Sequence, residues 1–188
     1  MIPEPLTVRS AIFMILAGVL ANNYIFEKAL GAAPMFGYRR NRDLPLLGLQ
    51  VAIVMIITAP LLRAVEIYIL APFNLVFLQN LVFTAVILII VYLASLLYKQ
   101  EIRSKYFLLL AVNSAVFTLA ANTISEGLEL PAAFLTGLGV GLGYLLALFL
   151  YAGLRERIDD YYLPKTFRGL PVDLLAAAII SMALLAFK

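Results

Sequence analysis

Two polar pairs, Asn22-Asn23 and Asn113-Ser114, carry the side chains of this chain that are best suited to hold an ion or a cofactor. Each pair interrupts an apolar stretch, the first beginning near Val8 and the second near Tyr106. Amide and hydroxyl groups form hydrogen bonds, and they are costly in hydrocarbon unless a partner satisfies them. Two roles therefore stay open for these pairs: they join the ends of broken helices, or they line a site for an ion or cofactor.

Charged residues close to these pairs offer further candidates. Glu27 and Lys28 follow the first pair, and Glu126 and Glu129 follow the second. If Glu27 and Lys28 lie within a membrane, we expect them to be paired or to face a cavity, whereas at the membrane surface they are ordinary interfacial residues. Glu126 and Glu129 either attract cations at the mouth of a pathway or are simply solvated.

The elements that must position these groups are apolar helices. The chain has 188 residues, of which 64% are hydrophobic, and its mean hydropathy is +1.00. Soluble domains are about 45–50% apolar, and a membrane-spanning helix needs roughly 20 mostly apolar residues. Six apolar stretches fill most of the chain, at about residues 8–26, 46–65, 76–98, 106–121, 132–154 and 170–187. We predict an all-α integral membrane protein with six transmembrane helices, forming one polytopic domain over residues 1–188.

The basic residues indicate how these helices are oriented. Eleven of the 14 lysines and arginines lie in three segments, residues 27–45, 99–105 and 153–169. Short loops rich in lysine and arginine face the cytoplasm, so both termini are expected outside. We predict a multi-pass protein of the prokaryotic cytoplasmic (inner) membrane. The basic residues form no separate domain, so we expect no nucleic-acid partner.

Several kinds of chemistry are excluded by the sequence. The chain contains no cysteine and no histidine, which excludes disulfides, thiolate-bound metal and histidine acid–base catalysis within it. The glycine-rich string 139–143 lies in an apolar stretch with no preceding strand, so it is not a nucleotide-binding loop. We therefore expect no catalytic residue and no metal site in this chain, and no catalysis by the chain alone.

Sequence echoes indicate an internal repeat of about 90 residues. The segment 22–26 is echoed by 113–117 at an offset of 91, and Gly48 is echoed by Gly137 at an offset of 89. Three spans per copy place the second copy upside down, and inverted repeats commonly meet at discontinuous helices near the bilayer midplane. We predict repeats of about 1–98 and 99–188, broken half-helices in the first and fourth spans, and polar pairs that face each other near the repeat axis.

Glycine and proline indicate where helices break or pack closely. Gly31 and Pro34 do not continue a stable helix, so we expect irregular backbone after Asn23. In the fifth span, the pairs 137/141 and 139/143 have the spacing that lets a neighbouring backbone approach. Close helix packing is the favoured explanation for these glycines, and the approach of a ligand is the alternative. Pro60 is expected to kink the second span.

Motifs distributed over nearly the whole chain resemble the A subunit of the Rnf complex and the E subunit of the sodium-pumping NADH:quinone reductase. The motifs are Asn22-Asn23 with Lys28, Leu30-Gly31, Pro34 and Gly37, then Leu75-Val76-Phe77-Leu78, Asn113-Ser114-Ala115, Leu154-Arg155-Glu156-Arg157 and Phe167-Arg168-Gly169. The resemblance implies a six-span subunit that pairs with a homologous subunit of opposite topology in a multi-subunit membrane complex. In the Rnf case, that complex couples electron transfer between ferredoxin and NAD to sodium or proton transport.

The resemblance also implies a [2Fe-2S] cluster, to which this chain and its homologous neighbour would each supply two cysteines. Here Ala33 and Ser114 stand at the cysteine positions. Alanine has no ligand atom, and serine is a poor ligand for iron compared with thiolate. Three explanations remain: the complex has lost the cluster, the chain is a divergent paralogue, or the cysteines were replaced by engineering. We expect no cofactor in this chain, with flavins and iron–sulfur clusters in partner subunits.

The resulting hypothesis is a membrane subunit of a redox-coupled ion-translocating complex. Its expected path-lining residues are Asn22, Asn23, Asn113 and Ser114, with Glu27 added. The alternatives are a small transporter or channel that works without redox partners, and a purely structural membrane subunit.

Overall fold

The protein is built from helices throughout the part that the structure describes. The computed structural model describes residues 8–37, 44–96, 113–184 and 186, and no strand occurs among them. The α-helices are α1 (Val8–Leu16), α2 (Ala33–Gly37), α3 (Leu44–Val65), α4 (Gln79–Leu96), α6 (Ser114–Ser125), α7 (Leu130–Glu156) and α8 (Leu170–Leu184). Short turns extend or join them: the π-helical turns η1 (Ala17–Ala21) and η3 (Glu66–Leu70), and the 3-10 turns η4 (Val76–Leu78), η5 (Asp160–Tyr162) and η6 (Lys165–Phe167).

Three of these helices are long and apolar enough to cross a membrane. They cover Leu44–Leu70, Val76–Ala94 and Leu130–Glu156, and they correspond to the second, third and fifth predicted spans. Two shorter apolar helices, Val8–Ala21 and Leu170–Leu184, correspond to the first and sixth. The predicted fourth span is described only as α6, because residues 106–112 lie outside the described part. The prediction of a helical membrane protein is confirmed at this level.

The two long helices α3 and α7 form the centre of the molecule, and small residues let them approach closely. A Cβ added to Gly141 would lie 3.0 Å from the Ala52 carbonyl oxygen. On either side of this contact, Gly48 lies against Leu145 and Leu148 of α7, and Gly137 lies against Ile56 and Ala59 of α3. The predicted close packing at glycines 137 and 141 is therefore confirmed, and the neighbouring helix is α3.

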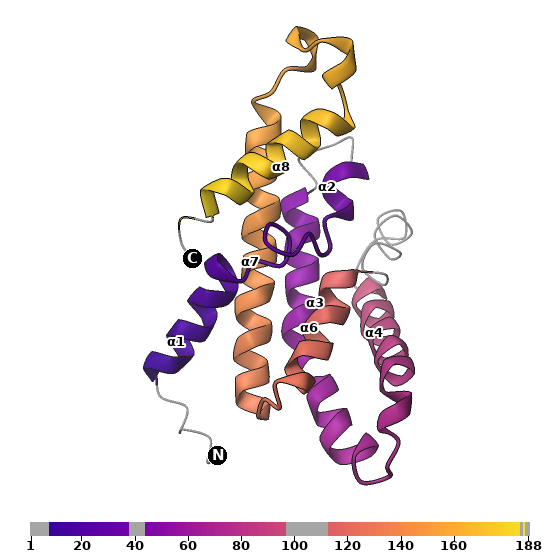
Figure 1. Ribbon diagram of the computed structural model, residues 1–188. Helices are drawn as coiled ribbons and strands as arrows, with labels where there is room; N and C mark the ends of the chain where they lie inside the picture. The colour runs from indigo at the N-terminus through magenta and orange to yellow at the C-terminus, as the bar shows by residue number, and fades with distance from the viewer. Residues whose placement is uncertain (1–7, 38–43, 97–112, 185, 187–188) are drawn as a thin grey trace.

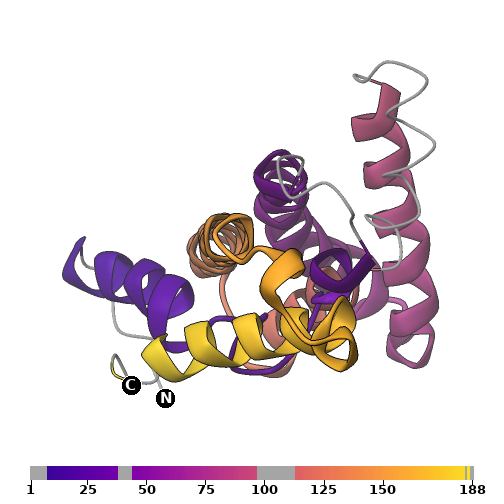
Figure 2. The ribbon, with the colours of Figure 1, turned by 90° about the horizontal axis from the view of Figure 1, so that it is seen from above.

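The other pair of glycines on α7 receives the first helix. A Cβ on Gly139 would lie 3.0 Å from the Ile15 Cα, and one on Gly143 would lie 2.6 Å from the Gly18 carbonyl oxygen. Gly18 itself faces the Gly139 backbone, where an added Cβ would lie 2.8 Å from the carbonyl carbon. Helix α7 thus stands between α3 on one face and α1 with η1 on the opposite face, as Figure 2 shows from above.

The connections between helices gather at opposite ends of the molecule. The turns from α3 to α4 and from α6 to α7 lie at one end, and the segment between α7 and α8 lies at the other (Figure 1). Between these ends, α1 and η1 stop part of the way along α7, and the chain then turns away from the helix direction. This break, which the sequence predicts, positions the candidate site.

Candidate functional site

The first helix ends at Asn22, and the loop 22–32 that follows is held against the middle of α7. The Asn22 backbone amide closes the π-helical turn by donating to the Ala17 carbonyl at 2.7 Å. A π-helical turn before a break is common at functional sites. The chain regains helical structure only at Ala33, the start of α2. The predicted irregular backbone after the polar pair is confirmed.

Asn23 fixes the start of this loop with both ends of its amide. Its Nδ2 donates to the Gly143 carbonyl at 2.8 Å and to the Val19 carbonyl at 3.2 Å. Its Oδ1 accepts from the backbone amides of Ile25 at 3.1 Å and Phe26 at 3.3 Å. The side chain is 2% exposed. One buried asparagine thus satisfies backbone groups on both sides of the break and ties them to α7, as irregular backbone inside a membrane protein requires.

Asn113 immediately precedes α6 and contacts the same loop through a tyrosine. Its Oδ1 accepts from the Ala115 amide at 2.9 Å, which caps the helix, and its Nδ2 donates to the Tyr144 hydroxyl at 3.0 Å. That hydroxyl donates to the Gly31 carbonyl at 2.8 Å, and the Gly31 amide donates to the Ser114 Oγ at 2.9 Å. Both backbone groups of Gly31 are therefore satisfied by side chains from the second half of the chain.

Gly31 is the residue that this arrangement requires. Its φ of 70° lies in the left-handed region, which side chains with a Cβ rarely adopt. A Cβ there would also lie 2.7 Å from the Asn113 Oδ1 and 2.8 Å from a Tyr144 ring carbon. The glycine thus permits the close approach of the loop to α6 and α7.

Three further side chains bind the same region, and each comes from a different helix. The Ser181 hydroxyl of α8 donates to the Phe26 carbonyl at 2.6 Å, and the Tyr151 hydroxyl of α7 donates to the Met35 carbonyl at 3.0 Å. The Asn122 Nδ2 of α6 donates to the Tyr24 hydroxyl at 2.9 Å. Reading the sequence for paired polar residues missed Tyr144, Tyr151, Asn122 and Ser181. The only sequence feature that could have indicated these residues is that each carries a single polar group within a mostly apolar helix.

The five predicted path-lining residues do not lie together: some are buried in the packed interior, and others line one of two open pockets. Asn23 and Asn113 are buried, and their partners Gly143 and Tyr144 are adjacent on α7. Asn22 is exposed and lines a pocket of about 320 Å³ between α1, α6 and α7. Glu27 is exposed and lines a pocket of about 20 Å³, together with Asn23. Ser114 is exposed, and neither Ser114 nor Asn113 lines either of these two pockets.

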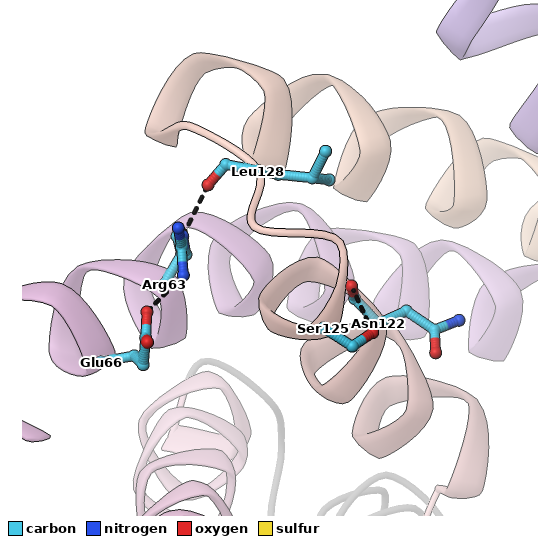
Figure 3. A network of polar contacts seen from close by, with 5 residues as sticks. All are labelled: Arg63, Glu66, Asn122, Ser125 and Leu128. Carbon is cyan, nitrogen blue, oxygen red and sulfur yellow. Dashed lines mark hydrogen bonds and ion pairs between the residues drawn. The ribbon is translucent and has the colours of Figure 1, made fainter. Parts of the chain in front are cut away.

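An arginine of α3 holds the connection between α6 and α7. Arg63, at the C-terminal end of α3, donates from Nε to the Leu128 carbonyl at 2.5 Å and forms an ion pair with Glu66 (Figure 3). In the last turn of α6, the Ser125 hydroxyl donates to the Asn122 carbonyl at 3.1 Å. The connection between α6 and α7 is therefore anchored to α3.

Ala33 and Ser114, which the resemblance places at the two cysteine positions, do not fit an iron–sulfur cluster. Ala33 has no ligand atom, and the Ser114 Oγ already accepts the Gly31 amide. Within the described residues, no group of three or more histidine, cysteine, aspartate or glutamate side chains converges to hold a metal. At these two positions the described part of the chain therefore offers no thiolate and no free serine oxygen for such a cluster.

Known proteins are similar to this chain over nearly its whole length. Residues 11–188 match a family described as "Rnf-Nqr subunit, membrane protein". The A subunit of the ion-translocating oxidoreductase complex of Syntrophotalea carbinolica is 30% identical over 186 residues, covering 95% of this chain and 96% of the relative. The A subunit of the Na(+)-translocating ferredoxin:NAD(+) oxidoreductase complex of Acetobacterium woodii is 30% identical over 94% of this chain and 96% of the relative. The corresponding protein of Cereibacter sphaeroides is 32% identical over 93% of this chain and 94% of the relative.

Proposed function

Because this chain belongs to the Rnf-Nqr family of membrane subunits, we propose that it serves as the A subunit of an ion-translocating oxidoreductase complex. The complex would couple electron transfer of the ferredoxin and NAD type to sodium or proton transport. The name of the Acetobacterium woodii relative indicates sodium transport, ferredoxin and NAD for that protein, and the name of the Syntrophotalea carbinolica relative indicates ion transport. The chain itself contributes the helical scaffold and part of the ion or electron path. Flavins and iron–sulfur clusters belong to partner subunits.

The observation that carries this proposal is the broken first helix. Its loop lies against Gly143, the middle residue of α7, where Asn23 satisfies backbone groups on both sides of the break. Non-helical backbone at membrane depth is tolerated where it is buried in protein or lines a cavity, and such breaks form the ion sites of many transporters. We assign the lining of the path to Asn22, Asn23, Asn113, Ser114 and Glu27.

We further propose that the chain consists of two inverted three-helix repeats with six spans. Matched contacts at an offset of 89 residues support this symmetry. Position 48 corresponds to 137, 56 to 145 and 59 to 148, so the contacts of Gly48 with α7 repeat those of Gly137 with α3. Ala52 corresponds to Gly141, and these two residues touch each other, as expected of residues on a two-fold axis. Asn22 follows the end of η1 and Asn113 caps the start of α6, and these two positions are the ones that the proposed repeat relates at an offset of 91.

The proposal includes a partner and an orientation. We propose a homologous subunit of opposite topology as the neighbour of this chain within the complex. Both termini lie outside, and segments 27–45, 99–105 and 153–169 face the cytoplasm of a prokaryotic inner membrane. The support is the concentration of basic residues in these segments.

The test is isolation of the complex through an affinity tag on this chain in its native membranes. Flavin-containing and iron–sulfur subunits should copurify, and vesicles from a deletion strain should lose sodium or proton uptake driven by reduced ferredoxin and NAD. A chain that purifies without redox subunits, while ion transport persists without a reductant, would instead indicate a redox-independent transporter.

A purely structural role is the second candidate, and it is favoured by the four hydrogen bonds of Asn23 and the two of Asn113, all of them within the protein. Replacing both residues by leucine distinguishes the two. If they line the path, we expect impaired ion transport per assembled complex. If they only join helix ends, assembly falls, and the complexes that do assemble transport normally.

A further inference from the structure

The larger pocket extends from one end of the molecule to the broken helix. It has a volume of about 320 Å³ and is lined by α1 with η1, by the loop 22–32, by the C-terminal end of α6 and by the first turns of α7. Glu126, after the end of α6, lines it at the end of the molecule that carries the α6–α7 connection (Figure 1). Asn22 and Lys28 line it in the loop. The pocket thus joins the loop beside the middle of α7 to the end of α6.

Lys28 holds a positive charge at the inner end of this pocket. Its Nζ lies 4.7 Å from the centroid of the Tyr24 ring, a cation–π arrangement that fixes an ammonium group. The Tyr24 ring is 4% exposed, and its hydroxyl accepts the Asn122 Nδ2 at 2.9 Å. The sequence groups Lys28 with the basic segment 27–45, and the structure places Lys28 in the lining of the same pocket as Glu126.

The lining of the pocket suits water. Asn22, Tyr24, Asn122 and Thr136 bring amide and hydroxyl groups to its wall, beside the two charged residues. A water molecule occupies about 30 Å³ of the liquid, so the volume accommodates on the order of ten molecules. The polar residues come from the loop, α6 and α7, whereas α1 and η1 contribute the apolar residues Phe13, Met14, Ala17 and Gly18. A charged side chain at this depth in a membrane protein is expected to face such a cavity.

We propose that this pocket is a water-filled vestibule and that Lys28 is a fixed electrostatic barrier at its inner end, which repels monovalent cations. Water and small inorganic cations enter past Glu126, and the ammonium group raises the free energy of Na⁺ or H₃O⁺ beside the broken helix. Fixed positive charges exclude cations and protons from other membrane pores in the same way. This inference rests on the proposed function, because an ion-translocating complex must prevent ions from leaking without electron transfer.

The first test measures access to the vestibule. The chain has no native cysteine, so single cysteines report without background from this subunit. We would introduce Asn22→Cys or Thr136→Cys into the complete complex in sealed vesicles and label with membrane-impermeant methanethiosulfonates, one cationic and one anionic. Phe134→Cys is the matched control, because Phe134 is two residues from Thr136 on α7, is 44% exposed and does not line the pocket.

We expect both pocket cysteines to react from the side of the α6–α7 connection only, and Phe134→Cys to stay unreactive. The anionic reagent should react faster than the cationic reagent, and Lys28→Met should abolish that preference. Labelling of the two pocket cysteines no faster than that of the control would overturn the vestibule.

The second test measures the barrier. Complexes with Lys28→Met, Lys28→Arg or, as a control outside the pocket, Lys165→Met are reconstituted in proteoliposomes, and passive Na⁺ and proton entry is followed without reductant. Removing one fixed charge at close range should raise the leak about tenfold or more in Lys28→Met. Lys28→Arg and Lys165→Met should leave the leak unchanged.

An unchanged leak in Lys28→Met would overturn the barrier. Reductant-driven ion uptake by the unmodified complex is measured in the same vesicles. If that uptake is absent while the pocket cysteines react as expected, the proposed function has failed and the vestibule stands. If uptake is present and the pocket cysteines do not react, the vestibule has failed alone.

Discussion

At the scale of single residues, two neighbouring asparagines have different tasks. Asn23 is buried with four hydrogen bonds to backbone groups, whereas Asn22 is exposed at the wall of the larger pocket. The sequence alone treats them as one polar pair. The difference arises because the helix ends between Ala21 and Asn23, so consecutive side chains point to different surroundings.

This contrast predicts unequal effects of the same substitution. Asn23→Ala leaves the Gly143 carbonyl and the Ile25 and Phe26 amides without their side-chain partner, and buried unsatisfied groups cost about 1–3 kcal/mol each. We expect a loss of at least about 3 kcal/mol in unfolding free energy, seen as a lower thermal midpoint of the purified complex in detergent. Asn22→Ala is the adjacent control and should change the midpoint little. Equal midpoints for the two variants would contradict the assigned role of Asn23.

The Tyr144 hydroxyl carries a second prediction at this scale. It joins the Asn113 amide to the Gly31 carbonyl, so Tyr144→Phe leaves two buried groups unpaired while keeping the ring. We expect a destabilisation of about 1–3 kcal/mol. Tyr68→Phe removes the same atom from a side chain that is 66% exposed and should be neutral. Thermal unfolding of both variants, followed by size-exclusion chromatography, checks the difference, and a neutral Tyr144→Phe would show that the hydroxyl does not hold the loop.

At the scale of helices, α7 acts as the support for both the first helix and α3. Its four alternating glycines divide between two faces, because residues four apart share a helix face and residues two apart do not. The spacing therefore predicted close packing correctly. It did not identify Gly18 as the residue that faces Gly139 and Gly143, because a single glycine in an apolar helix has no distinctive pattern.

Two glycines on α7 offer a matched pair for testing this packing. A methyl group on Gly143 would lie 2.6 Å from the Gly18 carbonyl oxygen, whereas one on Gly153 would meet no described atom within 4 Å. Gly143→Ala should displace α1 and cost about 1–3 kcal/mol, as overpacking does. Gly153→Ala should be neutral or slightly stabilising, because alanine is the better helix former. Accelerated proteolysis of the α1 segment in Gly143→Ala alone would be the expected result, and equal proteolysis of the two variants would count against it.

At the scale of the whole molecule, the sequence predicted the class of fold and the break in the first helix, but not how the break is held. Hydropathy identifies long apolar helices directly, and Gly31 with Pro34 indicates interrupted helix after Asn23. The bonds from Tyr144, Tyr151 and Ser181 join residues more than 100 positions apart, and no local pattern specifies such partners. Side chains from α6, α7 and α8 converge on one loop only once the tertiary fold exists.

The proposed orientation of the whole molecule gives the last prediction. Helix α7 has 27 residues and is therefore about 40 Å long, enough to cross the roughly 30 Å hydrocarbon core with both ends in water. Glu129 precedes it at one end, and Tyr162, which is 83% exposed, follows it at the other.

The experiment labels single cysteines in sealed vesicles with a membrane-impermeant maleimide. Glu129→Cys should react only from the face opposite the cytoplasm, and Tyr162→Cys only from the cytoplasmic face. Phe149→Cys, on an exposed position within α7, should react from neither side. Reaction of the first two from the same side would show that α7 does not cross the membrane, and an exchange of their sides would reverse the proposed orientation and place the vestibule on the cytoplasmic face.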